Sequence, residues 1–380
     1  MGFERLARAY AERLGPARAA AARGDKVVGL VGAAIPRELV LASGRTPVLV
    51  TAELERPIPT AEHYIDPVVA PEIQALFEAA VEGEFEFLDL LVISRPYAQL
   101  YYYLKEIYRL GRAPKLPPLA IYDLIQSRRE AVRAYNLGRT RALAERLARE
   151  APRAIDEASL GAAIAEGNAV RALQRRLQAL RWQGRVSGTE ALQALGAGWF
   201  VSPKEYAAAL EAWLGQLDGA PARSGTRVVV STAEPFTHTG LHEALEGAGM
   251  LVVAEDDAFG SRAAGEDVGT GGDLIEAIAE KVWLDVATPA VNPYEDREAW
   301  FRAQAARPDV EAVVFYVPPS DRQFGWDLPR LAHFVAGLPK PALLVREDAA
   351  DPAGRAAISA KAAEFLRAPS LKPALPELVR

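Results

Sequence analysis

Residues 27–50 read VVGLVGAAIPRELVLASGRTPVLV, and this stretch decides the fold class. Its first five residues form a short, almost continuous apolar run, which is typical of a strand buried on both faces. Pro36 stands at the start of a predicted short helix, where its missing N–H costs nothing, and Gly44 ends that helix. Residues 46–50 predict a second strand. A strand, a helix and another strand in succession indicate parallel pairing through a right-handed crossover.

The same alternation continues outward from this stretch. It predicts helices at 3–22, 71–82, 97–110, 241–248 and 357–367, and further strands at 88–93, 119–122, 227–230, 250–254, 312–316 and 341–345. Residues 127–217 carry helical patterns alone. We therefore predict an α/β protein with two flavodoxin-like parallel-sheet domains, 1–126 and 218–380, and an intervening helical segment, 127–217.

The composition excludes several classes of protein. The chain has 380 residues, half of them hydrophobic, and a net charge of −6, which does not favour binding to nucleic acid or to an anionic membrane surface. It contains no cysteine, so disulfides, thiolate nucleophiles and cysteine-ligated metals or clusters are excluded. No run of about 20 apolar residues and no signal peptide are apparent, so we expect a cytoplasmic protein without a membrane span.

Polar residues follow most of the predicted strands, and ligands of open parallel sheets bind at the carboxyl ends of strands. The candidate substrate-binding residues are Ser94, Arg95, Ser231, Ser261, Arg262, Ser320 and Arg322. The candidate acids or bases are Glu38, Glu255, Asp256 and Asp257. The alternative for all of them is an ordinary solvated loop.

Two metal sites can be considered from residue types alone. The three consecutive acids at 255–257 could bind a divalent cation, but one acid that caps the next helix and two that are solvated explain them better. His238 and His242, four residues apart, could share a zinc ion, but no third ligand or motif accompanies them. We therefore predict no metal site.

A cluster of tyrosines at 97–108 favours a protein interface, because successive residues of a helix cannot all face one core.

Several segments together resemble one family. The opening 27–40, with ASGRTPV at 42–48, resembles the start of the 2-hydroxyacyl-CoA dehydratase and benzoyl-CoA reductase subunits, a strand followed by C-x-x-V-P-x-E, a short helix and A-x-G-x-x-P. Residues 164–171 and 186–190 are similar to the middle helices of that family, and 241–262 are similar to its LHELIEEAG…VVADD…GSR stretch.

The resemblance implies two flavodoxin-like domains per subunit and two related subunits paired with each other. It also implies a [4Fe–4S] cluster held by three cysteines at strand ends, an acyl-CoA bound nearby, and a radical reaction started by an ATP-driven activator. The three ligand positions correspond here to Gly32, to Ser94 or Arg95, and to the neighbourhood of Pro319, so none of them is a cysteine. Any [4Fe–4S] cluster is therefore expected on a partner subunit only.

Three functions remain open at this point. The first is a cluster-free subunit that pairs with a cluster-bearing paralogue, or with itself, and contributes to the acyl-CoA pocket or to the interface. The second is a repurposed protein that binds an acyl-CoA or another small anion without a redox role. The third is an independent enzyme that uses the acids named above for proton transfer in the crevice between the domains.

Overall fold

A computed structural model of the chain describes residues 2–54, 56–232, 238–285, 294–321, 324–337 and 340–367. Its two sheets are each four-stranded and all parallel. The first contains β1 (Val27–Val31), β2 (Thr46–Leu49), β3 (Leu90–Ser94) and β4 (Leu119–Tyr122). The second contains β5 (Thr226–Ser231), β6 (Met250–Glu255), β7 (Ala312–Tyr316) and β8 (Ala342–Val345). The predicted α/β class is confirmed.

Both sheets have the same topology. The strand orders are β2-β1-β3-β4 and β6-β5-β7-β8, so the chain reverses direction across the sheet between the first and third strands of each block. This is the point where ligands of doubly wound folds bind. β1, β3 and β7 are buried along their whole length, as their uninterrupted apolar sequences predict.

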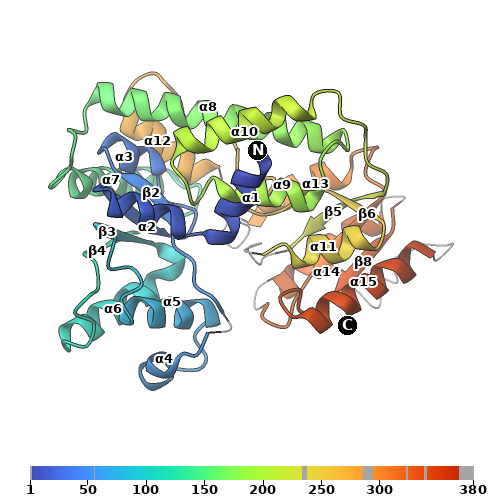
Figure 1. Cartoon of the computed structure of the whole chain (residues 1–380), viewed down its shortest axis with the longest axis horizontal. Coiled ribbons are helices and arrows are strands. Elements are labelled where there is room, and N and C mark those ends of the chain that lie inside the picture. Colours follow the sequence, from blue (N-terminus) through green and yellow to red (C-terminus); the bar gives the residue numbers. More distant parts are fainter. Residues whose placement is uncertain are drawn as a thin grey trace.

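Helices cover both sheets (Figure 1). The first block contains α3 (Arg37–Ala42), α4 (Pro59–Tyr64), α5 (Pro71–Val81), the 3₁₀ turn η1 (Arg95–Tyr97) and α6 (Ala98–Arg109). The second contains α11 (Gly240–Gly247), α12 (Leu274–Leu284), α13 (Tyr294–Ala305), α14 (Phe324–Ala336) and α15 (Pro352–Arg367). The sequence patterns had not indicated α4, α12, α13 or α14.

The predicted helix 3–22 is two helices, α1 (Gly2–Glu12) and α2 (Gly15–Ala22). Arg13 between them has a φ of 49°, which is left-handed backbone. The cause is Pro16 at the start of α2, because proline has no N–H to continue the hydrogen-bond ladder of α1. The periodicity of apolar residues runs through this break, so the pattern alone did not show it.

The helical segment contains α7 (Glu130–Ala148), α8 (Glu157–Trp182), α9 (Gly188–Ala197) and α10 (Pro203–Leu217). Side chains at the starts of α8, α9 and α10 accept hydrogen bonds from free backbone N–H groups there, with full capping boxes on α8 and α9. α8 packs on α3 beside the first sheet and also contacts β6 of the second. α12, although it comes much later in the chain, packs on α7 and α8 (Figure 1).

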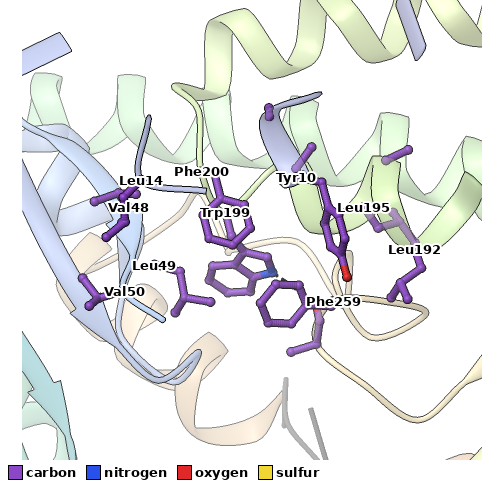
Figure 2. Packing of buried hydrophobic residues seen from close by; sticks show 14 of the residues in the cluster. Tyr10, Leu14, Val48, Leu49, Val50, Leu192, Leu195, Trp199, Phe200 and Phe259 are labelled. Atoms are coloured by element: carbon purple, nitrogen blue, oxygen red, sulfur yellow. Dashed lines mark hydrogen bonds between the residues drawn. The ribbon is translucent and has the colours of Figure 1, made fainter. Parts of the chain in front are cut away.

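An aromatic cluster lies between the end of β2 and Phe259 in the loop after β6 (Figure 2). Phe259, which follows β6, lies with its ring centroid 6.3 Å from Trp199 and 6.1 Å from Phe200. The backbone N–H of Leu49 in β2 donates to the Trp199 carbonyl at 2.9 Å, and the indole N–H of Trp199 donates to the Ala258 carbonyl at 3.2 Å. The helical segment thus connects directly to the end of one strand in each sheet.

Within the described ranges, no helix is both long enough and apolar enough to span a bilayer.

Candidate ligand pocket between the sheets

A pocket of about 110 Å³ lies beside this aromatic cluster. Its wall comes from five parts of the chain: the segment after β1 with α3, Gln126 after β4, the middle of α8, the turn between α9 and α10 with the start of α10, and α12 with the loop that precedes it. A water molecule needs roughly 10–15 Å³ of such space, so the pocket has room for roughly seven to eleven water-sized groups. Ile35, Val170 and Trp199 supply apolar surface on its wall.

Glu38 and Arg171 form one ion pair in this wall. Arg171 Nη1 donates to Glu38 Oε1 at 2.8 Å, and both side chains are almost entirely shielded from solvent, at 11% and 7% exposure. Asn168 accepts from the same guanidinium at 2.5 Å through its Oδ1. Gly167 makes the pair possible, because a Cβ there would lie 2.9 Å from Glu38 Oε1. The pair attaches α3 of the first block to α8.

Two more cations in the wall have acidic partners. Lys281 of α12 forms an ion pair with Asp285, and Arg262 forms one with Asp256 behind the wall. The guanidinium of Arg262 also lies 4.9 Å from the ring centroid of Trp300, a cation–π contact that holds it flat.

Arg37 differs from these cations. Its Nη2 donates to the Gly198 carbonyl at 2.7 Å, and its guanidinium lies 5.0 Å from the ring centroid of Trp199. Burial lowers the pKa of the Arg37 guanidinium below its ordinary value, while the nearby carboxylates of Glu38 and Glu166 act in the opposite direction.

The three acids after β6 are sealed inside the protein. Glu255, Asp256 and Asp257 are at most 1% exposed. Burial alone would raise the pKa of Glu255, but Arg181 and His242 outweigh it, so the pKa lies well below its usual range. Burial raises the pKa of Asp256, and Arg262 offsets that increase only in part. Asp257 accepts the Phe259 N–H at 3.0 Å and so shapes the turn.

Arg181 of α8 is the centre of the charged cluster around Glu255. It donates to both carboxylate oxygens of Glu255 and, through Nε, to the Val252 carbonyl at 2.9 Å. His242 Nε2 lies 3.0 Å from Glu255 Oε2. All three side chains have no solvent exposure. Of the four candidate acids, only Glu38 lines the pocket.

The carboxyl edge of the first sheet has been closed around Gly32. Its φ is 93°, and a Cβ there would lie 2.2 Å from Ser94 Oγ and 3.0 Å from the ring of Tyr97. Ser94 Oγ donates to the Val31 carbonyl at 2.8 Å, and Tyr97 donates to the carboxylate of Glu72. The space that a side chain at position 32 would need is therefore filled.

The other candidate binding residues are dispersed. Arg95 is half-exposed and pairs with Asp123, Ser320 and Pro319 are exposed, and Ser231 is buried at the end of β5. Ser261 accepts the N–H of Glu255 at 3.2 Å and lines a second cavity next to the pocket. Arg322 lies outside the described residues. Of the six candidate binding residues that the structure describes, Arg262 alone lines the pocket itself.

The described ranges contain no cluster of three histidine or carboxylate side chains able to hold a metal ion. Arg37, Arg171, Gln126 and Lys281 line the pocket but were not among the predicted site residues. Arg37 could have been found from the sequence, because it stands between Pro36 and the candidate Glu38. Arg171 on α8, Lys281 on α12 and Gln126 in the loop after β4 meet at the pocket only through the packing of segments far apart in the chain.

The fold and the pocket define a class: a two-sheet α/β protein with a candidate ligand pocket near the carboxyl ends of its sheets, beside a helical segment. The model of the 2-hydroxyglutaryl-CoA dehydratase D-component family matches residues 33–367, and the chain belongs to that family. The comparison with curated proteins finds no significant match.

The residues at the cluster-ligand positions expected from the resemblance do not fit an iron–sulfur cluster. Gly32 has no side chain and no room for one, Ser94 is committed to a backbone carbonyl, and Pro319 has no donor atom. Cysteine thiolates are the ligands of such clusters, and the chain has none. No cysteine-bound cofactor is held by this chain.

Proposed function

We propose that the chain is the cluster-free subunit of a complex of the 2-hydroxyacyl-CoA dehydratase or benzoyl-CoA reductase type, and that it contributes the acyl end of an acyl-CoA pocket. The observation that carries this proposal is the pocket itself. It lies between the two sheets and is lined by residues 33–38 and 262–264, from the segments that carry the family resemblance. The redox group would be supplied by a cysteine-bearing partner.

The dimensions of the site support an extended ligand. The pocket has room for an acyl group but not for a whole nucleotide-bearing thioester. A second cavity of about 250 Å³ shares Gln174, Arg262, Ala264 and Asp285 with it. Because the two cavities share part of their wall, we expect a thioester whose acyl group occupies the first to extend past Arg262 toward the second.

The residues of this chain then have binding and orienting roles. Apolar side chains take up the hydrocarbon part of the acyl group and exclude water, at about 25 cal/mol per Å² of apolar surface. The Glu38–Arg171 pair fixes the wall, because two partnered, almost buried charges resist displacement. No proton transfer is assigned to Glu255, Asp256 or Asp257, since they have no access to the pocket.

The first test is affinity purification from the native organism under strict anaerobiosis, with iron and sulfide assays of whatever co-purifies. A stoichiometric partner with a [4Fe–4S] cluster is the expected result. A colourless protein without a partner would refute the role as a subunit. Calorimetry with acyl-CoAs of increasing chain length tests the pocket separately, and uniformly flat titrations would refute the acyl-CoA site.

A second function has one observation in its favour. Residues of this chain line the pocket from several sides and include both apolar side chains and cations, which is what the binding of a small anionic ligand requires. A repurposed binding protein for an acyl-CoA or small anion, without a redox role, would show tight calorimetric binding by the isolated chain together with no partner in the purification.

A further inference from the structure

β4 is an edge strand of the first sheet, and Figure 1 shows it on the side of the first block that faces away from the second. The N–H of Leu91 in β3 donates to the Pro118 carbonyl at 2.9 Å, which fixes how the two strands pair. Successive residues of a strand in a parallel pair direct their backbone groups alternately toward and away from the neighbour. Pro118 and Ala120 therefore face β3, whereas the N–H and C=O groups of Leu119 and Ile121 point outward.

Two other sheet edges already use the corresponding groups. In β2 the Leu49 N–H donates at 2.9 Å to a carbonyl of the turn after α9, and Pro47 has no N–H to offer. In β6 the Val252 carbonyl accepts from Arg181 at 2.9 Å, and the Val252 N–H donates to Glu246 at 3.3 Å. Within the ranges that the structure describes, no side chain or loop bonds to the outward groups of β4 in this way.

β4 also lacks the features that usually keep an exposed edge from pairing, such as a charged side chain or a proline on the outer side. Residues 117–122 carry no charge, and the first three residues of the strand are only half-buried. Pro118 faces β3, so its missing N–H does not interrupt the outer edge. Unpaired backbone groups beside apolar side chains are a template for a further strand.

Exposed tyrosines gather on the helix that covers this edge. α6 contacts β4, and its Tyr101, Lys105 and Tyr108 share one face at helical spacing. Tyr103 is on the opposite flank, where its ring centroid lies 6.4 Å from that of Phe77 in α5. Tyr108 is 60% exposed, and Lys105 Nζ lies 5.5 Å from the Tyr101 ring centroid. The flank of α6 away from α5 thus offers aromatic surface together with a cation that suits aromatic rings.

We propose that two copies of the chain associate through β4, with the two strands antiparallel about a two-fold axis at Ala120. Leu119 of one copy then faces Ile121 of the other, and each such pair exchanges both of its outward backbone hydrogen bonds. The same axis turns the tyrosine-bearing flanks of the two α6 helices toward each other. A second copy fits this edge because the pairing is self-complementary, whereas a foreign strand would have to bring a matching flank of its own. The inference does not depend on the proposed function.

The first test is sedimentation equilibrium of the isolated full chain, which should give twice the chain mass of 41.0 kDa. Ile121→Pro removes an outward N–H without touching the bonds to β3, and it should weaken the dimer about 10- to 100-fold. Leu344→Pro is the matched control, because Leu344 is an outward residue of the edge strand β8, and the dimer should persist. A monomer at about 100 μM would overturn the proposal, in favour of a foreign strand or a bare edge. Dissociation by Leu344→Pro but not by Ile121→Pro would overturn it too.

A second pair of variants leaves the strand intact, so it decides the question even if Ile121→Pro fails to fold. Tyr108→Lys places a charge on the flank that already carries Lys105, and it should weaken the dimer by about 10-fold through lost aromatic contacts and like-charge repulsion. Tyr102→Lys is its control, because Tyr102 is similarly exposed, at 65%, but lies outside that face of the helix. Equal effects of the two variants on the dimer would contradict the proposed interface.

The register has its own test, because the chain contains no cysteine and an introduced thiol is therefore unique. Ala120→Cys places two thiols across the two-fold axis, on residues whose Cα atoms would lie about 4.5 Å apart, within reach of a disulfide. Leu119→Cys places them farther apart than the limit of about 7 Å. Mild oxidation should link Ala120→Cys into a covalent dimer and leave Leu119→Cys unlinked. Failure of Ala120→Cys to link, or equal linking of both variants, would overturn the proposed pairing.

Discussion

Removing Arg181 should destabilise the protein far more than removing a surface arginine. Arg181→Met leaves the Glu255 carboxylate, which has no solvent exposure, without its main counter-charge. Breaking a buried ion pair from one side typically costs about 3–5 kcal/mol, because the remaining charge is neither paired nor hydrated. Arg176→Met, on the same helix, removes an ion pair whose side chains are 45% and 60% exposed, and it should cost about 0–1 kcal/mol.

The double variant Arg181→Met/Glu255→Leu separates the buried charge from the packing. It leaves no uncompensated charge, so its main cost is the carboxylate partner lost by His242 Nε2, about 1–3 kcal/mol. We therefore expect the double variant to be more stable than Arg181→Met alone. Such a recovery is possible only if the two residues interact directly.

The assay is urea-induced unfolding at neutral pH, followed by far-ultraviolet circular dichroism, with every variant compared at matched slope of the transition. The pKa of Glu255 is lowered in the folded protein, so its stabilising contribution is complete above the unfolded value of about 4.3 and declines as the pH falls below it. The difference between Arg181→Met and the unaltered chain should accordingly shrink in acid. If Arg181→Met and Arg176→Met unfold within about 1 kcal/mol of each other, the reasoning is refuted.

Three further predictions concern single sites. Gly32→Cys should lower the free energy of unfolding by at least about 2 kcal/mol and should not take up iron and sulfide on reconstitution. Gly24→Cys is the control, because Gly24 has a similar φ of 95° but no atom within 4 Å, so it should lose only the backbone strain. Equal losses by thermal unfolding would contradict the close packing around Gly32. Burial lowers the pKa of His238 in the folded state, so the unfolded chain binds a proton first as the pH falls, and the free energy of unfolding should decrease between about pH 7 and 5. His238→Gln should flatten this part of the plot of stability against pH. An unchanged plot would exclude His238 as the cause of the decrease. Gly167→Ala should crowd the Glu38–Arg171 pair and weaken ligand binding, while Gly161→Ala on the same helix should gain up to about 1 kcal/mol in stability and leave calorimetric binding unchanged.

The strands could be predicted because a buried parallel strand has a local sequence pattern, a short apolar run between turn residues. β1 and β7 lie within a residue of their predicted ends. The helices α12 and α13 were not predicted, although both carry start signals: Asp273 caps α12, and Glu295 and Asp296 stand in the first turn of α13. The break between α1 and α2 depends on one residue, Pro16, within an otherwise continuous helical spacing of apolar residues. Because that spacing is judged over a window of many residues, a single proline does not interrupt it.

The site was only partly predictable for a related reason. The rule that ligands meet strand ends correctly selected Glu38 and Arg262, both of which line the pocket. The same rule selected Glu255, whose surroundings depend on Arg181, 74 residues earlier in the chain. No local feature of the sequence shows that a helix from the middle segment covers that strand end. Exposure is a tertiary property, and residue type at a strand end does not determine it.

One helix fixes both sides of the pocket. Arg171 and Arg181, ten positions apart on α8, are held about 15 Å apart along its axis. Arg171 binds Glu38 beside the first sheet, and Arg181 binds Glu255 at the end of β6 in the second. Neither contact involves the cluster-ligand positions at Gly32, Ser94 and Pro319. The two ion pairs that fix α8 against the two sheets are therefore independent of a metal cluster. It follows that ligand binding should be measurable on the isolated, iron-free chain.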